Sequence, residues 1–248
     1  MRIILHGCNG RMGQAISQMG LNIVAGVDRE KKENRYPTFT KISEVNVEAD
    51  VVIDFTHVSA VPDLLTYCLD KKLPLVLCTT GLTEELTEQI NKASEHIAIF
   101  QAYNMSIGIN VIARALKQMT KPLHQLGYDI EIVDFHHNKK VDAPSGTAEF
   151  LAETVNATLN HSMTLNTNRF DKMQAREAKE IGVHSIRGGT VVGRHNVIFA
   201  GENEVIELVH HAESRLIFAK GAVAAAQFLA NKTAGKYNME DVLDEMIG

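Results

Sequence analysis

The sequence predicts an α/β protein with a Rossmann-type, doubly wound parallel sheet, followed by a second, α+β domain built on an open mixed sheet. Strand-like apolar runs alternate with helical runs over residues 1–104, which is typical of a parallel sheet covered by helices. A glycine-rich turn follows the first strand, as it does in dinucleotide-binding proteins. Between residues 183 and 211, strands follow one another through short loops, which favours a mixed or antiparallel sheet.

The composition argues against several classes of protein. The 248 residues are 45% hydrophobic, which is enough to bury real cores. A formal net charge of -5 without a long basic run argues against nucleic acid or an acidic membrane surface as the main partner. The sequence has no apolar run of about 18 residues of the kind that a membrane helix needs. The three cysteines lack the paired spacings of a zinc or redox site. We therefore expect a cytoplasmic protein with a small-molecule ligand and no membrane.

The first strand, residues 2–6, runs into a G-x-x-G-x-x-G turn and then into a helix that ends near residue 19. In such a βαβ start, Gly7 allows the tight turn, Gly10 lets a pyrophosphate approach the backbone, and Gly13 lets the helix pack on the strand. The spacing differs from the usual G-x-G-x-x-G, so an ordinary glycine-rich turn is the alternative reading of this segment.

An acid at the end of the second strand, residues 22–27, strengthens the dinucleotide hypothesis. Asp28 lies 21 residues after Gly7, where a ligand of the ribose hydroxyls is expected. Arg29 follows it directly and Arg11 lies in the glycine loop, so a 2′-phosphate is also compatible with this sequence. The choice between NADH and NADPH therefore stays open.

The rest of the first domain repeats the strand, polar loop and helix pattern. Residues 29–48 are predicted to be a loop with at most a short helix near 41–45. Strands at 50–56, 74–78 and 97–100 and helices at 58–70 and up to about 94 follow. Polar residues follow these strands, and the carboxyl ends of parallel strands are where α/β sheets bind ligands. Phe55, at one of these ends, is predicted to be a core residue or to face a nicotinamide.

The pattern changes after a helix at 107–120. A long strand at 129–135, a helix at 147–159 and a polar segment at 160–180 precede strands at 183–187, 191–200 and 205–211. An Ala-rich helix at 215–232 and a short polar tail close the chain. The predicted domains are a dinucleotide-binding domain at 1–104 plus 216–248, and a substrate-binding and oligomerisation domain at 105–215.

Residues 136–148 concentrate titratable and charged side chains in a short segment, which reads His-His-Asn-Lys-Lys-Val-Asp-Ala-Pro-Ser-Gly-Thr-Ala. If the strand continues to His137, the rings of His136 and His137 point to opposite faces, so only one of them need be a proton donor. Asp142 is predicted to pair with a lysine or to form a turn. The backbone amides after Pro144 open a helix and suit a carboxylate.

Two other chemistries compete for these residues. A metal site would draw on the histidine pairs and the acid, but neighbouring strand histidines point apart and no H-x-x-x-H spacing is present. A serine nucleophile at Ser145 lacks the G-x-S-x-G elbow. The candidate metal ligands are His136, His137, Asp142, His210 and His211.

Five segments of the chain closely resemble the 4-hydroxy-tetrahydrodipicolinate reductase (dihydrodipicolinate reductase) family. They are residues 136–148, the glycine loop at 7–13, Thr-Thr-Gly at 79–81, Ser-Ile-Arg-Gly-Gly at 185–189 and Val-Gly-Arg-His at 192–195. The H-H-x-x-K-x-D-A-P-S-G-T-A string is specific to that family, whereas many dehydrogenases share the glycine loop. The resemblance implies that NADH or NADPH reduces a cyclic, unsaturated dicarboxylate in lysine and diaminopimelate biosynthesis, without a metal.

Carried over residue by residue, the resemblance makes His136 the catalytic proton donor and Lys140 the second essential cation. Its substrate-binding positions are His137, Lys140, Ser145, Gly146, Thr147 and Arg187. Its cofactor-binding positions lie in the glycine loop, at the ribose and along the nicotinamide, and they are Gly7, Asn9, Gly10, Arg11, Met12, Gly13, Asp28, Arg29, Phe55, Thr79, Thr80, Gly81, Ala102, Asn104 and Met105.

The chain departs from the family pattern in a few places. Asp134 stands where the family usually has Glu, Tyr103 stands where Pro or a small residue is usual, and the segments 29–48 and 160–180 are short. The resemblance also implies a homotetramer built through the sheet of the second domain. A non-catalytic dinucleotide-binding sensor of the same fold remains the alternative function, and a metal-dependent hydrolase or lyase that uses the histidine pairs is a third.

Overall fold

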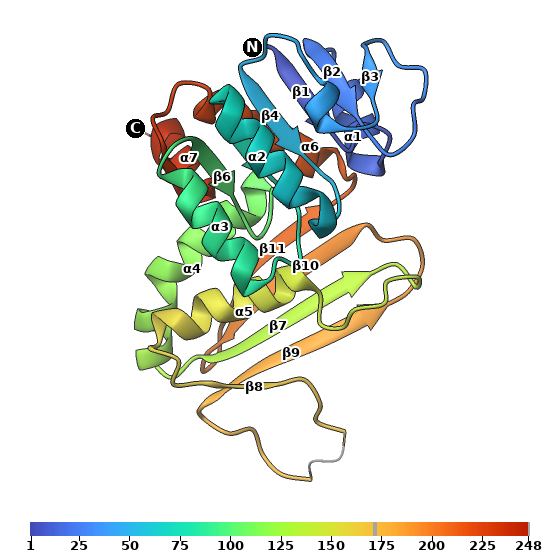
Figure 1. The fold of residues 1–248 in the computed structure, drawn as a ribbon. Helices are drawn as coiled ribbons and strands as arrows, with labels where there is room; N and C mark the ends of the chain where they lie inside the picture. Colours follow the sequence, from blue (N-terminus) through green and yellow to red (C-terminus); the bar gives the residue numbers. More distant parts are fainter. Residues whose placement is uncertain (171–172, 248) are drawn as a thin grey trace. The chain divides into compact units, whose positions relative to one another are not determined.

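The computed structural model describes residues 1–170 and 173–247, and it divides the chain into two compact units (Figure 1). Unit 1 comprises Met1–Ile107 and Arg215–Gly248, and unit 2 comprises Gly108–Ser214. Residues 171 and 172, within the predicted polar segment at 160–180, lie outside the described residues, as does residue 248, the last of the predicted first domain.

Unit 1 is built on a seven-stranded sheet in the order β12-β6-β5-β4-β1-β2-β3, in which all neighbouring strands are parallel. Six of these strands follow the order 3-2-1-4-5-6 of a dinucleotide-binding fold, so the predicted Rossmann-type sheet is confirmed. The strands are β1 (Ile3–His6), β2 (Ile23–Val27), β3 (Thr38–Phe39), β4 (Val51–Asp54), β5 (Leu75–Leu77), β6 (Ala98–Gln101) and β12 (Gly235–Tyr237).

Helices cover both faces of this sheet because its central strands are apolar on both faces. Ile3 and Leu5 of β1 pack on one side, in a cluster with α1 (Arg11–Ser17), α6 (Leu216–Leu229) and α7 (Met239–Ile247). Ile4, between them, packs on the other side, with α2 (Val61–Lys71) and α3 (Glu84–Ser94). Two short 3-10 helices, η1 (Ile42–Glu44) and η2 (Val58–Ala60), lie in the connections.

Three elements of unit 1 were absent from the sequence-based prediction. The predicted loop at 29–48 contains the unpredicted strand β3, as well as η1 at the position of the predicted short helix, and the predicted polar tail contains β12 and α7. Strands of two or three residues are too short to show a hydrophobic period. The apolar residues of α7, such as Met239, Val242 and Leu243, do have helical spacing and are buried, so this helix could have been predicted.

Unit 2 is built on a five-stranded mixed sheet in the order β11-β10-β7-β9-β8, as predicted. The middle strand β7 pairs in parallel with β9 and antiparallel with β10, which in turn pairs antiparallel with β11. The predicted polar segment at 160–180 contains β8. The strands are β7 (Asp129–His136), β8 (Thr164–Asn166), β9 (Glu180–Arg187), β10 (Gly193–Ala200) and β11 (Val205–Ala212).

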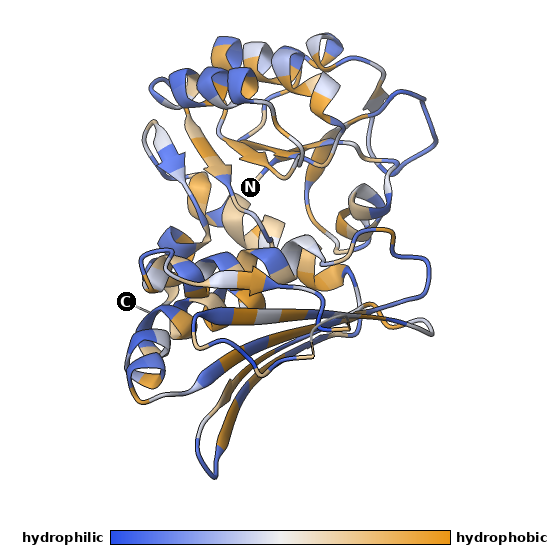
Figure 2. Ribbon diagram, turned by 90° about the horizontal axis from the view of Figure 1, so that it is seen from below, coloured by the Kyte–Doolittle hydropathy of each residue, from blue (hydrophilic) through white to orange (hydrophobic). Residues whose placement is uncertain are grey.

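Helices α4 (Ile107–Gln125) and α5 (Gly146–Thr158) pack on one face of this sheet. Alternate residues of the strands, such as Ile130 and Ile132 of β7, point into that core. The long strands are accordingly banded in orange and blue in Figure 2. The opposite face also carries apolar side chains, and there Ile186 and Val209 are 48% and 44% exposed.

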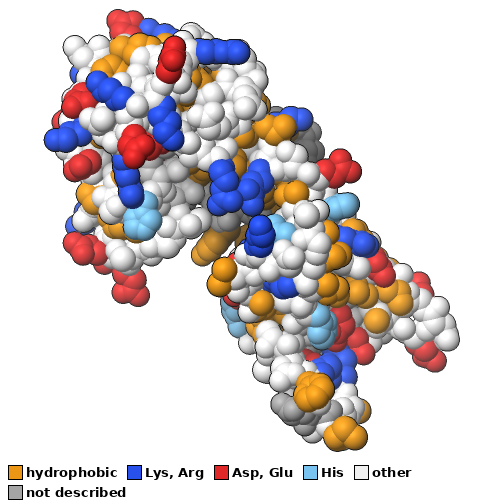
Figure 3. Space-filling view, turned by 90° about the vertical axis from the view of Figure 1, so that its right-hand side faces the viewer, with side chains coloured by type: hydrophobic (Ala, Val, Ile, Leu, Met, Phe, Trp, Pro, Cys, Tyr) orange, Lys and Arg blue, Asp and Glu red, His pale blue; other side chains and the backbone are white. Residues whose placement is uncertain are grey.

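The surface of unit 1 mixes both signs of charge. Acidic and basic side chains are interspersed over the upper part of the face drawn in Figure 3, which belongs to this unit. Among the described residues, every helix is too short or too polar to cross a lipid bilayer.

Candidate active site

The glycine loop connects β1 to α1 with little room for side chains. Gly7 has a φ of +85°, and a Cβ on it would lie 2.7 Å from the backbone oxygen of Phe55. A Cβ on Gly13 would lie 2.3 Å from the backbone oxygen of Gly7. These two glycines therefore let α1 begin directly against the loop, as the sequence predicted for a pyrophosphate-binding turn.

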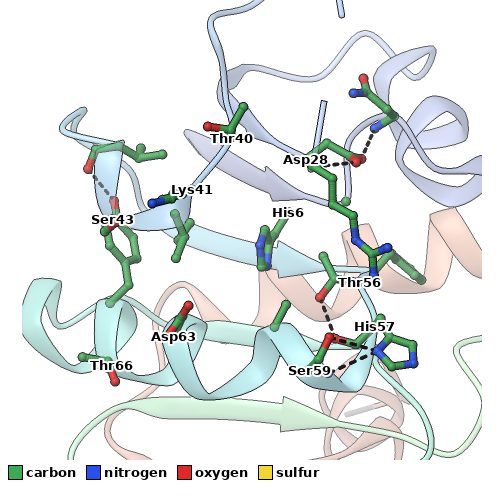
Figure 4. Close-up of a pocket in the computed structure, with 18 of the residues that line it drawn as sticks. His6, Asp28, Thr40, Lys41, Ser43, Thr56, His57, Ser59, Asp63 and Thr66 are labelled. Atoms are coloured by element: carbon green, nitrogen blue, oxygen red, sulfur yellow. Dashed lines mark hydrogen bonds between the residues drawn. The ribbon is translucent and has the colours of Figure 1, made fainter. Parts of the chain in front are cut away.

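Asp28 extends from the end of β2 beside this loop, and its carboxylate is held by two backbone N–H groups (Figure 4). The N–H of Asn9 donates to Oδ2 at 2.8 Å, and the N–H of Arg29 donates to Oδ1 at 2.8 Å. The carboxylate is thus fixed at the carboxyl edge of the sheet, and its remaining lone pairs can accept hydrogen bonds from hydroxyl groups.

A cavity of about 1060 Å³ opens at this edge, at the ends of β1, β2 and β4. Figure 4 shows His6, Asp28, Lys41 and Asp63 pointing into it from different elements. Ligands of doubly wound sheets bind where the strand order reverses, and here that point lies between β1 and β4. Of the predicted cofactor residues, those that line the cavity are Gly7, Asn9, Gly10, Asp28, Arg29 and Phe55.

The residues present fit a dinucleotide. A side chain at position 10 would lie 3.3 Å from the backbone oxygen of Gly7, so glycine keeps this point of the loop open. Gly10 also begins α1 without a side-chain cap, which leaves the first turn of the helix facing outwards. Together with the fixed acceptor at Asp28, these features match the needs of a pyrophosphate and of a ribose.

The cavity has further lining residues that the sequence-based prediction missed. His57 caps η2, with its Nδ1 accepting the N–H of Ser59 at 3.3 Å, and both residues line the cavity. His6 also lines it, and its Nδ1 lies 2.9 Å from Oδ1 of Asp54. The signal was present, because these polar residues stand at or just after the ends of apolar strands.

The other predicted cofactor residues do not line this cavity. Thr79 is buried, and its hydroxyl lies 2.5 Å from Oδ2 of Asp54. Asn104 accepts the N–H of Ser106 at 2.8 Å, so both side chains shape the loops that carry them. The remaining residues of this group are Arg11, Met12, Gly13, Thr80, Gly81, Ala102 and Met105.

In unit 2 the candidate proton donor, His136, is the last residue of β7. The sheet register places Arg187 of β9 beside it, and Gly193 of β10 lies on its other side. A Cβ on Gly193 would lie 3.1 Å from Nε2 of His136, so the glycine leaves that nitrogen room. His136 is only 8% exposed, whereas His137 lies beyond the strand and is half-buried.

Asp134 lies two residues earlier on the same face of β7 and is fully buried. Its Oδ2 accepts the N–H of Ser145 at 2.7 Å, and its Oδ1 accepts a hydrogen bond from the guanidinium of Arg187. The Nδ1 atom of His136 lies 3.4 Å from the same Oδ1. Burial opposes ionisation, but the hydrogen bonds from His136, Arg187 and Ser145 outweigh it and hold the pKa of Asp134 well below its ordinary value. Asp134 is therefore an anion.

His195 of β10 completes the cluster, and the prediction did not assign it a role. Its ring lies 5.1 Å from that of His136 at an interplanar angle of 71°, and its Nε2 lies 3.0 Å from Oγ of Ser145. Burial, together with the electrostatic effect of the neighbouring His136, lowers the pKa of His195 to about 3, so the ring of His195 is neutral at physiological pH.

The loop after β7 brings a lysine and a helix N-terminus to the same cluster. Nζ of Lys140 lies 2.8 Å from Oδ1 of Asp142, which confirms the predicted pairing of this acid with a lysine. Ser145 caps α5, with its hydroxyl accepting the N–H of Ala148 at 3.2 Å. A Cβ on Gly146 would meet nothing within 4 Å, so the start of this helix is open. Helix N-termini of this kind bind carboxylates.

The predicted catalytic and substrate-binding residues thus come from two neighbouring strand ends, one loop and one helix start of unit 2. Arg187 connects the strand and the loop, because its guanidinium donates both to Asp134 and to the backbone oxygen of Asp142, the latter at 2.7 Å. The cluster combines an imidazole, two cations and backbone donors. Such a set can hold an anionic ligand and transfer a proton to it.

Comparison with known proteins adds an independent line of evidence. The chain matches the family model described as dihydrodipicolinate reductase, N-terminus, over residues 1–105, and the one described as dihydrodipicolinate reductase, C-terminus, over residues 108–243. Relatives from Clostridium novyi (strain NT) and Caldanaerobacter subterraneus subsp. tengcongensis are both named 4-hydroxy-tetrahydrodipicolinate reductase. They are 48% and 45% identical over 248 residues, with 98% of this chain and 98% of each relative covered.

Solved structures share the fold. A dipicolinate-bound dihydrodipicolinate reductase from Paenisporosarcina sp. TG-14 matches with a TM-score of 0.78 at 23% identity, covering 96% of this chain and 97% of that chain. An amine dehydrogenase from Mycobacterium smegmatis matches with a TM-score of 0.63 at 10% identity, covering 97% and 95%. At these identities the likeness concerns the fold alone.

Proposed function

Because the chain belongs to the dihydrodipicolinate reductase family, we propose that it reduces 4-hydroxy-tetrahydrodipicolinate to tetrahydrodipicolinate with NADH or NADPH, in lysine and diaminopimelate biosynthesis. It is an oxidoreductase, as its curated relatives are. The observation that carries the proposal is the buried His136, held between Asp134, Arg187 and Gly193, with Lys140 and the start of α5 in the same cluster.

Unit 1 is proposed to hold the dinucleotide. The carboxylate of Asp28 would accept the ribose hydroxyls, and the glycine loop with the start of α1 would face the pyrophosphate. When bound, the reduced nicotinamide supplies the hydride.

Unit 2 is proposed to hold the substrate and to return the proton. Lys140, Arg187 and the first N–H groups of α5 would bind the two carboxylates of the substrate, because they are the positive groups of this cluster. Addition of hydride to one carbon of a conjugated imine leaves negative charge on the neighbouring carbon. His136 would protonate that carbon, so that one hydride and one proton complete the reduction once the 4-hydroxyl group has been lost as water.

A coupled assay tests this function. The unstable substrate is generated enzymatically, and the loss of reduced-nicotinamide absorbance is followed with each cofactor. We expect turnover that depends on both substrate and cofactor, and inhibition by dipicolinate, the ligand of the Paenisporosarcina relative. Absence of turnover with both cofactors, together with intact cofactor binding, would instead favour the sensor of the same fold. Loss of activity with a chelator would favour the metal-dependent alternative.

Replacing Asp28 by Ala is expected to raise the KM for NADH by about tenfold while changing the KM for NADPH less. The carboxylate accepts hydrogen bonds from ribose hydroxyls but repels a 2′-phosphate, so wild-type protein should use NADH at least as well as NADPH. Steady-state kinetics with both cofactors measures this, and Glu33→Ala, an exposed acid outside the cavity, is the control. A strong wild-type preference for NADPH would show that Arg29 and Arg11 dominate the pocket.

We further propose that the protein is a cytoplasmic homotetramer that assembles through the open face of the unit 2 sheet. That face carries exposed apolar residues, including Ile186 and Val209, on two of its strands. Light scattering should then give four times the 27.4 kDa of one chain. Val209→Glu should reduce this mass, whereas Leu126→Glu, which adds the same charge at a 75% exposed position after α4, should not. A wild-type mass of one chain would contradict the proposal.

A further inference from the structure

We propose that Asp134 is a positioning residue that fixes the tautomer of His136, with the ring proton on Nδ1, so that Nε2 is the nitrogen that carries and gives up the transferable proton. This inference rests on the proposed reduction and extends it. It names Nε2 as the atom that carries the transferred proton, and the carboxylate of Asp134 as the group that determines this.

Asp134 can act towards His136 only as an acceptor. Its carboxylate is fully buried and accepts hydrogen bonds from the guanidinium of Arg187, from the N–H of Ser145 at 2.7 Å and from the hydroxyl of Ser185 at 3.3 Å. An ionised carboxylate has lone pairs but no proton to give. The nitrogen of His136 that faces it at 3.4 Å, Nδ1, must therefore bear the hydrogen of that contact.

The three-strand register makes this geometry a property of the sheet. Asp134 lies in one row with Ser185 of β9 and His195 of β10. His136 lies in the next row on the same face, beside Arg187 of β9. Because alternate residues of a strand share a face, a spacing of two residues places the carboxylate beneath the imidazole.

The other nitrogen of His136 faces a position without a side chain. A Cβ on Gly193 would lie 3.1 Å from Nε2, closer than most side-chain contacts, and glycine removes it. The space beside Nε2 is therefore available to a ligand, whereas the space beside Nδ1 is filled by Asp134. The two nitrogens have different neighbours and, by this inference, different functions.

His195 cannot substitute for His136 in this role. Its Nε2 lies 3.0 Å from the hydroxyl of Ser145, and the residue is 5% exposed. Ser145 thus contacts both residues that hold His136 in place, because its backbone N–H donates to Asp134 and its hydroxyl lies within hydrogen-bond distance of His195. The neutral ring of His195 packs edge-on against His136 and restricts the rotation of that ring.

The tautomer can be read directly. In protein with ¹⁵N-labelled histidine, the two ring nitrogen shifts show which nitrogen is protonated, and His136→Gln identifies the signal. At a pH at which the imidazole is neutral, we expect the proton of His136 on Nδ1 in the wild type and in Asp134→Glu, and a loss of this preference in Asp134→Asn. A wild-type proton on Nε2, or an unchanged tautomer in Asp134→Asn, would overturn the inference. This readout needs no turnover, so it stands apart from the outcome of the reductase assay.

Kinetics supplies the second readout. Asp134→Asn should lower kcat at least tenfold with little change in the KM for the dinucleotide, and Asp134→Glu should recover most of the loss because it restores the carboxylate. Asp129→Asn, an exposed acid at the start of the same strand, is the matched control and should leave kcat unchanged. Failure of Asp134→Glu to recover activity while it keeps the Nδ1 tautomer would count against the inference.

A third variant tests the working nitrogen even if Asp134→Asn does not fold. Gly193→Ala places a methyl group beside Nε2 without touching Asp134, so kcat should fall several-fold while the tautomer stays the same. Full activity in Gly193→Ala would show that Nε2 is not the nitrogen that meets the substrate, and it would overturn the assignment.

Discussion

Replacing His136 by Asn is expected to lower kcat by about 100- to 10,000-fold while leaving the affinity for NADH nearly unchanged. A positioned general acid contributes a factor of this size, and Asn cannot deliver a proton at neutral pH. The proposed cofactor residues lie in unit 1 and His136 lies in unit 2, so the effects on turnover and on cofactor affinity should separate. Turnover is measured in the coupled assay, and cofactor binding by the change in nicotinamide fluorescence.

The matched control for this variant is His161→Asn, because His161 is an exposed histidine of the same unit whose nearest acid, Glu153, lies 3.5 Å from its Nδ1. It should retain full activity. If His136→Asn weakens NADH binding as strongly as it lowers kcat, His136 has a structural function and the assignment of the proton donor is wrong.

Replacing Lys140 by Met is expected to lower kcat/KM by about 100-fold, because a charge-assisted hydrogen bond to a carboxylate contributes about 1.5–3 kcal/mol. Methionine keeps much of the length and apolar surface of lysine but removes the ammonium group. The change also leaves Asp142 without the lysine that lies 2.8 Å from it, so its negative charge is less well compensated beside the proposed substrate site. Both effects disfavour binding of a dicarboxylate.

Lys139→Met separates this effect from a general loss of positive charge. Lys139 is the exposed neighbour of Lys140 in the same loop and should tolerate the change with less than a twofold loss. Equal losses in the two variants would show that the loop acts through its overall charge, and they would remove Lys140 from the list of specific ligands.

Much of the fold could be predicted because the sheet of unit 1 has a strong pattern. Its central strands are continuous apolar runs, and the glycine turn after β1 marks the start of a dinucleotide-binding fold. Two of the elements that were missed in unit 1, β3 and β12, are two and three residues long. They pair with strands that are already buried, so their existence depends on tertiary contacts and not on a pattern of their own.

The candidate site was predicted unevenly for a similar reason. His136, Lys140 and Ser145 are close in sequence and could be grouped by inspection. The residues that hold His136 in place contact one another although they are far apart in the chain, as Asp134 contacts Arg187 and Ser145 contacts His195. These contacts follow from the order and register of β9, β7 and β10, which the sequence does not specify. In the sequence, Asp134 stands out only as a departure from the family pattern.

Unit 1 is assembled from the two ends of the chain, which has a consequence for biosynthesis. The apolar face of β1 and β4 packs against α6, and α6 leaves the ribosome only after all of unit 2 has been made. Domains usually fold from the N-terminus onwards during synthesis. In this nascent chain the order is reversed, because the domain encoded first is completed last. Its sheet face lacks the packing of α6 until residues 216–229 have been synthesised.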